Sequence, residues 1–175
     1  YERSLGLVLT ERDFDLLTVS EQFQGTSSTN AGVYDLYDTV QICVPQRTGL
    51  VYSVHYVNEG IKAATLFDLD ALNQKDKYQV FFGGNYAEIT ITTNAGTGRS
   101  ILILKDSYAN AMISPMTAYY DKITLIDPRY YYGDLEPMVQ YGGYDEVLFL
   151  YNVNSYVTDL SLMDVLEELP PAGEE

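Results

Sequence analysis

The stretch Ile101-Leu102-Ile103-Leu104-Lys105-Asp106-Ser107-Tyr108-Ala109-Asn110 decides the fold that we expect for this chain. Four consecutive apolar residues without polar alternation are typical of a strand covered on both faces in a parallel α/β sheet. The polar residues that follow, and the helical spacing of the methionines and tyrosines between positions 112 and 120, predict a helix that begins at Asp106 or Ser107. Ser107 is therefore expected at a junction between a strand and a helix.

Two interpretations of Ser107 are open at this point. The unpaired N–H groups and the positive dipole end of a helix favour negative charge near its first turn, which would help an alkoxide or an oxyanion. Serine is also a common N-cap residue, and a cap needs no chemistry.

Length, charge and composition restrict the class of protein. A chain of 175 residues has the size of one domain, 1–175, and is long enough to bury a core. Its net charge of −15 argues against binding nucleic acid or an anionic membrane. Seventeen tyrosines fit sugar-binding and interface surfaces, and they fit ordinary half-buried packing equally well. We expect a neutral or cationic partner.

Cysteine and histidine usage gives no indication of a metal or a cofactor. One cysteine, Cys43, excludes an internal disulfide framework and a cysteine-based metal site, and its position in an alternating stretch predicts a buried small hydrophobic residue. The sequence has no His, Cys and carboxylate cluster with ligand spacing and no EF-hand spacing, although a calcium site built from carboxylates and carbonyls stays open. No apolar run is long enough to cross a membrane. We predict no metal, no cofactor and no membrane contact by this chain.

The N-terminal half is predicted to be rich in β-structure. Residues 1–10 resemble the end of a helix followed by a short extended piece, and the turn-rich residues 11–32 favour a loop. Residues 33–45 and 50–57 predict a hairpin, and with the extended piece 61–67 they form a β-rich insertion, 33–67.

The only histidine, His55, lies within the second of these predicted strands. Alternation places Tyr52, Val54 and Tyr56 on the core face and leaves His55 on the more exposed face. A structural or surface role for His55 is favoured over a catalytic one.

The C-terminal half is predicted to alternate strands and helices, with an α/β core over 75–154. The other elements that we expect here are a short helix over 68–77 capped by Asp68, strands over 78–82, 86–93, 121–126 and 146–151, a turn over 94–99, helices over 134–142 and 157–169, and a disordered tail over 170–175.

Small or polar residues follow four of the predicted strands. In a parallel sheet the ligand site lies outside the carboxyl ends of the strands, so we expect these residues to lie close together. The candidate site residues at these strand ends are Gly84, Asn85, Asp106, Ser107, Asp127, Arg129, Asn152 and Asn154.

Four segments in this half resemble the DHHW proteins, which are similar to SGNH hydrolases and to bacterial alginate O-acetylation proteins. The segments are Lys75-Asp76-Lys77-Tyr78 leading to Phe82-Gly83-Gly84-Asn85, then Lys105–Asn110, Ile126–Tyr131 and Leu150–Asn154.

The resemblance implies an SGNH-hydrolase-like fold, a flavodoxin-like three-layer α/β domain with a mostly parallel sheet. Ser107 matches the family's candidate nucleophile, and Gly84 and Asn85 would lie near its oxyanion position. Arg129 matches the family's Arg-Tyr-Tyr stretch, and its guanidinium would bind a carboxylate or polarise an acyl group.

The Asp-His-His-Trp motif that names the family is absent from this sequence, which has no tryptophan. A serine hydroxyl is a weak nucleophile unless a base takes its proton, and His55 is expected elsewhere. We therefore expect this chain to be the C-terminal portion of a longer protein whose upstream residues supply the Asp and the His.

The resemblance implies a bacterial, extracytoplasmic protein that hydrolyses or transfers O-acetyl groups on cell-surface or secreted polysaccharide. It would act only together with the N-terminal segment of the same protein. One alternative is a non-catalytic carbohydrate-binding or envelope-assembly module on the same scaffold. Another is a stable fragment whose activity the sequence does not define.

Overall fold

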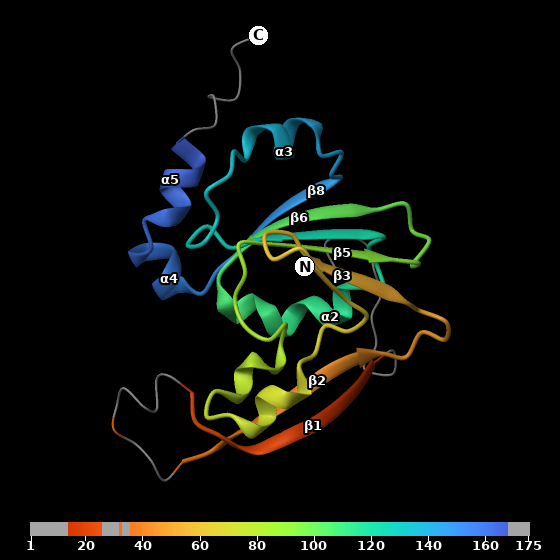
Figure 1. The fold of residues 1–175 in the computed structure, drawn as a ribbon, viewed down its shortest axis with the longest axis vertical. Helices are drawn as coiled ribbons and strands as arrows, with labels where there is room; N and C mark the ends of the chain where they lie inside the picture. The colour runs from red at the N-terminus through yellow and green to blue at the C-terminus, as the bar shows by residue number, and fades with distance from the viewer. Residues whose placement is uncertain (1–13, 26–31, 33–35, 168–175) are drawn as a thin grey trace.

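The computed structural model describes residues 14–25, 32 and 36–167, which form two β-sheets with short helices around them (Figure 1). The smaller sheet pairs β1 (Phe14–Phe23) with β2 (Asp38–Pro45) in antiparallel register. The larger sheet has six strands in the order β4-β3-β5-β7-β6-β8. Its strands are β3 (Tyr52–Tyr56), β4 (Ile61–Ala63), β5 (Glu88–Thr93), β6 (Ser100–Lys105), β7 (Lys122–Ile126) and β8 (Glu146–Leu150).

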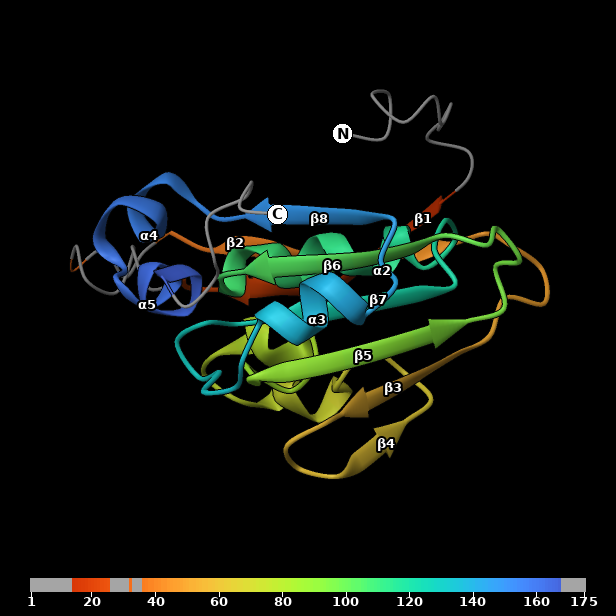
Figure 2. The ribbon, with the colours of Figure 1, turned by 90° about the horizontal axis from the view of Figure 1, so that it is seen from above.

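The six-stranded sheet is mixed, so the prediction of a mostly parallel sheet is wrong. β6 is parallel to β7 and to β8, whereas the pairs β5–β7, β3–β5 and β3–β4 are antiparallel. The predicted turn at 94–99 is the reason, because it reverses the chain directly between β5 and β6 and leaves no room for a crossover. Figure 2 shows β5 and β6 running in opposite directions, with β4 and β8 at the two edges.

β6 is the most buried strand of the sheet, and the prediction that it is covered on both faces is confirmed. Ile101 and Ile103 belong to a core cluster that also contains residues of β2, β3, β5 and β7. Leu102 and Leu104 point into a second cluster on the other face, which includes Leu162. Burying each such side chain contributes about 1.5–3 kcal/mol, so this run holds both layers to the sheet.

Different elements cover the two faces of the sheet (Figure 1). The first cluster contains Ile113 and Met116 from α2 (Ile113–Met116), and β1 and β2 lie on the side of α2 that faces away from the six-stranded sheet. The second cluster is covered by α3 (Glu136–Tyr141) and α5 (Ser161–Glu167).

Three predictions for the N-terminal half are wrong. Residues 14–23 form strand β1 where a loop was expected, because their backbone pairs with β2 from Phe14↔Pro45 to Phe23↔Asp38. The hairpin of 33–45 with 50–57 does not form, since β2 pairs with β1 while β3 pairs with β4 and β5. The predicted insertion 33–67 is thus shared between the two sheets. Cys43 is partly exposed where a buried residue was expected.

The predicted inward and outward faces of the strand that contains His55, which is β3, are confirmed. Val54 and Tyr56 are buried in the core, and His55 lies partly exposed on the opposite side of β3, next to Lys62 and Thr90.

Short 3-10 helices occupy the segment between β4 and β5. η2 (Leu69–Asn73) is capped by the Asp68 carboxylate as predicted, but residues 77–80 form η3 (Lys77–Val80), so the strand predicted over 78–82 is wrong. The carboxylate of Asp76 accepts from the Tyr78 N–H at 3.2 Å, and this cap favours a helical turn over an extended chain.

The remaining elements follow the predicted order. The strands predicted over 86–93, 121–126 and 146–151 are β5, β7 and β8, and the helix predicted over 134–142 is α3. The predicted helix 157–169 is instead two helices, α4 (Val153–Thr158) and α5, because Asp159 leaves the helical conformation and its carboxylate accepts from the Ser161 N–H at 2.9 Å. The features predicted at 1–10 and 170–175 lie outside the described residues.

Candidate functional site

Ser107 is the first residue of η4 (Ser107–Met112), which follows β6 directly and leads into α2. The predicted helix start is confirmed. The interpretation of Ser107 as the N-cap is wrong, because Asp106 occupies that position and its Oδ1 accepts from the Tyr108 N–H at 3.0 Å. The capping function therefore does not explain the serine.

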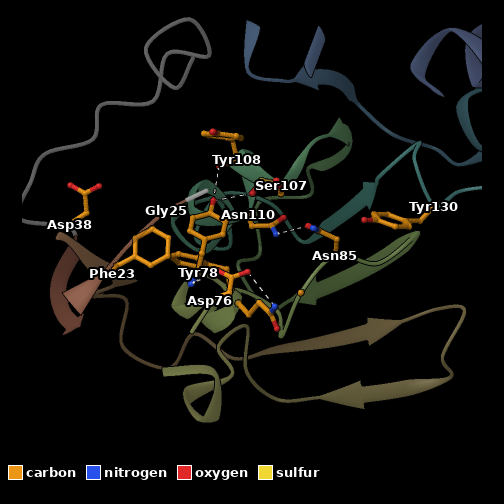
Figure 3. A pocket seen from close by; sticks show the side chains of 13 residues that line it. Phe23, Gly25, Asp38, Asp76, Tyr78, Asn85, Ser107, Tyr108, Asn110 and Tyr130 are labelled. Carbon is orange, nitrogen blue, oxygen red and sulfur yellow. Dashed lines mark hydrogen bonds between the residues drawn. The ribbon is translucent and has the colours of Figure 1, made fainter. Parts of the chain in front are cut away.

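Ser107 borders a cavity of about 600 Å³ at the end of β6 (Figure 3). The wall combines aromatic rings with amide, hydroxyl and carboxylate groups from the smaller sheet, from η3 and η4 and from the irregular segments next to them. The lining residues are Phe23, Gly25, Asp38, Asp76, Tyr78, Gln79, Phe81, Gly84, Asn85, Ser107, Tyr108, Asn110 and Tyr130.

Tyr78 fixes the backbone at the serine. Its hydroxyl donates to the carbonyl oxygens of Ser107 at 3.0 Å and Tyr108 at 3.1 Å. Burial raises the pKa of Tyr78 to about 12, so the hydroxyl keeps its proton at neutral pH and remains a donor. Tyr78 is missing from the sequence-based candidates because this segment was expected to be a strand, and its 3-10 conformation turns the ring toward η4.

A strained turn presents Asn85 to the cavity. Phe82, Gly83 and Gly84 all have positive φ, at 67°, 77° and 139°. A positive φ is rare for a residue with a bulky side chain, and such strain persists only where the surroundings enforce it. Phe82 is held on both sides, because its N–H donates to the Leu66 carbonyl at 2.8 Å and its carbonyl accepts from the Tyr56 hydroxyl at 3.1 Å.

Asn85 is oriented by Asn110, a lining residue that was not among the candidates. The Asn110 Nδ2 group donates to Asn85 Oδ1 at 3.2 Å, and the two side chains face each other in Figure 3. Since the oxygen of Asn85 accepts this bond, its NH₂ group is the donor that it can offer to a ligand. Asn110 is only 3% exposed, and its Oδ1 has no hydrogen-bond partner. The sequence feature that could have identified Asn110 is its position at the end of the stretch 101–110, three residues after Ser107.

Replacing Gly84 by alanine is expected to lower the free energy of unfolding by about 1–3 kcal/mol, because φ near 139° suits glycine almost exclusively. A Cβ at Gly84 would meet no atom within 4 Å, so the cost arises in the backbone. Gly49→Ala is the control, since Gly49 also has positive φ and open surroundings but does not line the cavity. Urea unfolding measures the loss, and the side-chain amide resonances of Asn85 and Asn110 should shift only in Gly84→Ala. Unchanged stability of Gly84→Ala would contradict the strained turn.

Asp106 joins the serine segment to the end of β8. Its Oδ2 accepts from the backbone N–H of Asn152 at 3.0 Å and also from the Asn152 side chain. Asn152 in turn caps α4 through Ser155, whereas Asn154 is exposed on α4 and does not line the cavity. Asp106 and Asn152 thus hold the segment that carries Ser107, and neither side chain lines the cavity.

Asp127 and Arg129 form an ion pair beside this site. Asp127 is fully buried and accepts from Arg129 Nε at 2.8 Å and Nη2 at 2.6 Å. The bond to Asp127 raises the pKa of Arg129, which is bound to this carboxylate and does not line the cavity. Lys105 Nζ lies 3.6 Å from Asp127 Oδ2, and burial lowers the pKa of Lys105 despite that neighbour.

The cavity wall contains no histidine among the described residues, and His55 lies on β3 outside it. Within residues 14–25, 32 and 36–167, no three His, Cys, Asp or Glu side chains are grouped so that they could hold a metal ion. The helices of this part of the chain are all too short or too polar to span a membrane. The described residues therefore supply a serine and amide groups, but no imidazole base, at the cavity.

Comparison with solved structures identifies similar folds. A DHHW family protein from Eubacterium siraeum DSM 15702 superposes with a TM-score of 0.76 at 21% identity, over 96% of this chain and 57% of that chain. Bacillus cereus PatB1 with a sulfonyl adduct gives a TM-score of 0.65 at 19% identity, over 87% of this chain and 51% of that one. PatB1 without the adduct gives 0.62 at 17% identity, over 87% and 53%. The chain thus spans between half and three fifths of the length of these proteins.

Comparison of sequences identifies the family. No curated protein matches the chain. The family model described as DHHW protein matches residues 9–126, which include β1 to β7, the turn before Asn85 and the segment that carries Ser107. The match thus begins well before the first of the segments on which the resemblance rested. The chain belongs to the DHHW protein family.

Proposed function

We propose that this chain carries the nucleophile-bearing part of an SGNH-like site that hydrolyses or transfers acyl groups, with Ser107 as the nucleophile. The observation that carries the proposal is the position of Ser107, at the end of the most buried strand and on the wall of a cavity that Asn85 also lines. The capping function of the turn belongs to Asp106, so the serine hydroxyl is not needed there.

The proposed chemistry has two steps. Ser107 Oγ attacks the acyl carbon, its proton passes to a base, and the ester C–O bond breaks as the leaving alcohol takes a proton from that base. Water or an acceptor hydroxyl then gives its proton to the same base and attacks the acyl carbon, and the bond between that carbon and Ser107 Oγ breaks as Oγ takes the proton back. The NH₂ group of Asn85 would donate to the oxyanion, with its amide held in orientation by Asn110.

The base would come from residues outside those described. The solved relatives are longer than this chain, which spans 57% of the E. siraeum protein and about half of PatB1. We propose that the N-terminal segment of the complete protein brings the activating Asp and His to Ser107, and that the complete protein acts outside the cytoplasm on O-acetylated carbohydrate.

Covalent labelling tests the nucleophile. PatB1 has been obtained with a sulfonyl adduct, and a nucleophilic oxygen attacks sulfur in a sulfonyl fluoride with loss of fluoride. The complete gene product treated with phenylmethylsulfonyl fluoride is expected to gain one sulfonyl group on the peptide that contains Ser107. Ser107→Ala should abolish the label, and Ser53→Ala, at an exposed serine on β3, should keep it. Label on another residue, or none, would overturn the assignment.

Non-catalytic carbohydrate binding is the second candidate. It is favoured by the exposed rings of Tyr108 and Tyr130 at the cavity, together with the lack of a histidine among the described lining residues. Calorimetric titration with neutral oligosaccharides separates the two candidates. Binding that persists in Ser107→Ala, without labelling of the wild-type serine, would support the binding module.

A further inference from the structure

We infer that the cavity beside Ser107 accepts sugars without negative charge and binds amine-bearing sugars more tightly than neutral ones. This inference rests on the proposed function, since it takes the ligand to be a carbohydrate. The new claim is that the cavity distinguishes sugars by their charge, and it is based on the charged side chains of the cavity wall.

The charged side chains of the wall are both acidic. Asp38, at the start of β2, and Asp76, the cap of η3, line the cavity from different elements of the fold. The described lining residues include no lysine, arginine or histidine. The sequence from 24 to 46, which contains Gly25 and Asp38, has none either. Low-dielectric walls that carry one sign of charge concentrate their field in a cleft and repel ligands of the same sign.

The cations that flank lining residues in the sequence, Lys75, Lys77 and Arg129, do not line the cavity. Lys77 follows Asp76, but its Nζ donates to the Leu72 carbonyl at 2.6 Å. Arg129 precedes Tyr130 and is paired with Asp127. Neither side chain lines the cavity, so the field of the two carboxylates is not cancelled from within the wall.

A buried acceptor points to a ligand or solvent group that donates. Asn110 Oδ1 is buried without a hydrogen-bond partner while its Nδ2 is used by Asn85. An unpaired buried carbonyl oxygen costs about 1–3 kcal/mol, and an O–H or N–H group relieves that cost. Hydroxyl and ammonium groups supply such donors, whereas a carboxylate supplies none.

The hydroxyl of Tyr78 does not alter this balance. It is protonated at neutral pH and donates to the backbone of Ser107 and Tyr108, so it is not free to bind a carboxylate. The other donors that the described lining side chains offer are neutral groups, including the NH₂ group of Asn85 and the hydroxyls of Ser107, Tyr108 and Tyr130. A uronate would therefore meet two carboxylates and no cationic donor among the described lining residues.

The test is calorimetric titration of the complete gene product at low salt with three probes of equal length. These are glucosamine oligomers, which are cationic below their amine pKa, N-acetylglucosamine oligomers, which are neutral, and galacturonate oligomers, which are anionic. We expect affinity to fall in that order by about fivefold at each step, the size of one exposed charge interaction. The differences should shrink in 0.5 M salt because screening weakens them.

Asp38→Asn is the matched variant, since Asp38 is exposed and its side chain is not a cap. It should lower the preference for glucosamine over galacturonate oligomers about fivefold. Asp70→Asn, the same charge change at an exposed residue of η2 outside the cavity, should leave that preference unchanged. Galacturonate binding as tight as glucosamine binding, or equal effects of the two variants, would overturn the inference.

Failure of this inference is distinguishable from failure of the proposed function. If no probe binds, charge selection and the carbohydrate ligand are both wrong, while sulfonyl labelling still decides the assignment of Ser107. If all three probes bind equally, the carbohydrate site stands and only the charge selection is overturned.

Discussion

Ser107→Ala is expected to reduce acetyl-ester cleavage or acetyl transfer by the complete gene product by about 10⁴-fold or more, because it removes the oxygen that forms the acyl intermediate. Residual activity would come from binding and oxyanion stabilisation alone. The measurement is the initial rate on a chromogenic acetyl ester, together with acetyl transfer to an oligosaccharide acceptor followed by mass spectrometry.

The variant should fold normally, which makes the rate interpretable. Tyr78 bonds to the backbone carbonyl of Ser107, and Asp106 supplies the cap, so neither interaction needs the serine hydroxyl. The melting temperature of Ser107→Ala should therefore stay close to that of the wild type, and Ser53→Ala should keep full activity. A Ser107→Ala protein that retains a tenth of the wild-type rate would rule out the nucleophile.

Asp127→Asn is expected to lower the free energy of unfolding by about 3–5 kcal/mol, the cost of breaking a buried ion pair by removing one partner. Asp127 is fully buried and is the carboxylate that both Arg129 and Lys105 face. Its neutralisation leaves Lys105, which is 1% exposed, as a buried ammonium next to a second cation. Urea unfolding at neutral pH measures the loss.

Lys105→Met is the matched control at the same pair. The ammonium of Lys105 has no hydrogen-bond partner, and Asp127 keeps its two bonds to Arg129 when the lysine is gone. We expect a change within about 1 kcal/mol, or a gain, because a hydrophobic side chain of similar volume avoids the cost of burying a charge. A loss as large as that of Asp127→Asn would show that Lys105 is a required partner.

The pH dependence of this pair follows from the lowered pKa of Lys105. Because the folded-state pKa is below the unfolded value of about 10.4, the folded protein binds fewer protons than the unfolded protein between those two values. Stability contributed by Lys105 therefore rises with pH in that window. The wild type should gain stability relative to Lys105→Met as pH increases from neutrality toward about 10, and a relative loss would contradict the direction of the shift.

The candidate site was only partly predictable from sequence. Ser107, Gly84 and Asn85 line one cavity. The sequence predicted them as site residues because they follow predicted strands and lie in segments that resemble the family. Asn110 and Tyr78 were not predicted, because their roles depend on contacts that the local sequence does not show. Asn110 bonds to Asn85, which is 25 positions away in the sequence, and Tyr78 on η3 bonds to Ser107 on η4, which is 29 positions away. The other predicted residues, Asp106, Asp127, Arg129, Asn152 and Asn154, do not line the cavity. Asp106 is bonded to Asn152 and Asp127 to Arg129, and Asn154 is exposed on α4.

The sequence by itself determined the strand at 101–105, its burial on both faces and the turn to a helix at Ser107, since unbroken apolarity and the polar break are local properties. Only the three-dimensional structure shows the mixed sheet, the pairing of β1 with β2 and the buried pair of Lys105 with Asp127. The physical reason is that backbone ladders and buried ion pairs join residues distant in sequence, and no local pattern of hydrophobicity encodes which partner a strand or a charge will find.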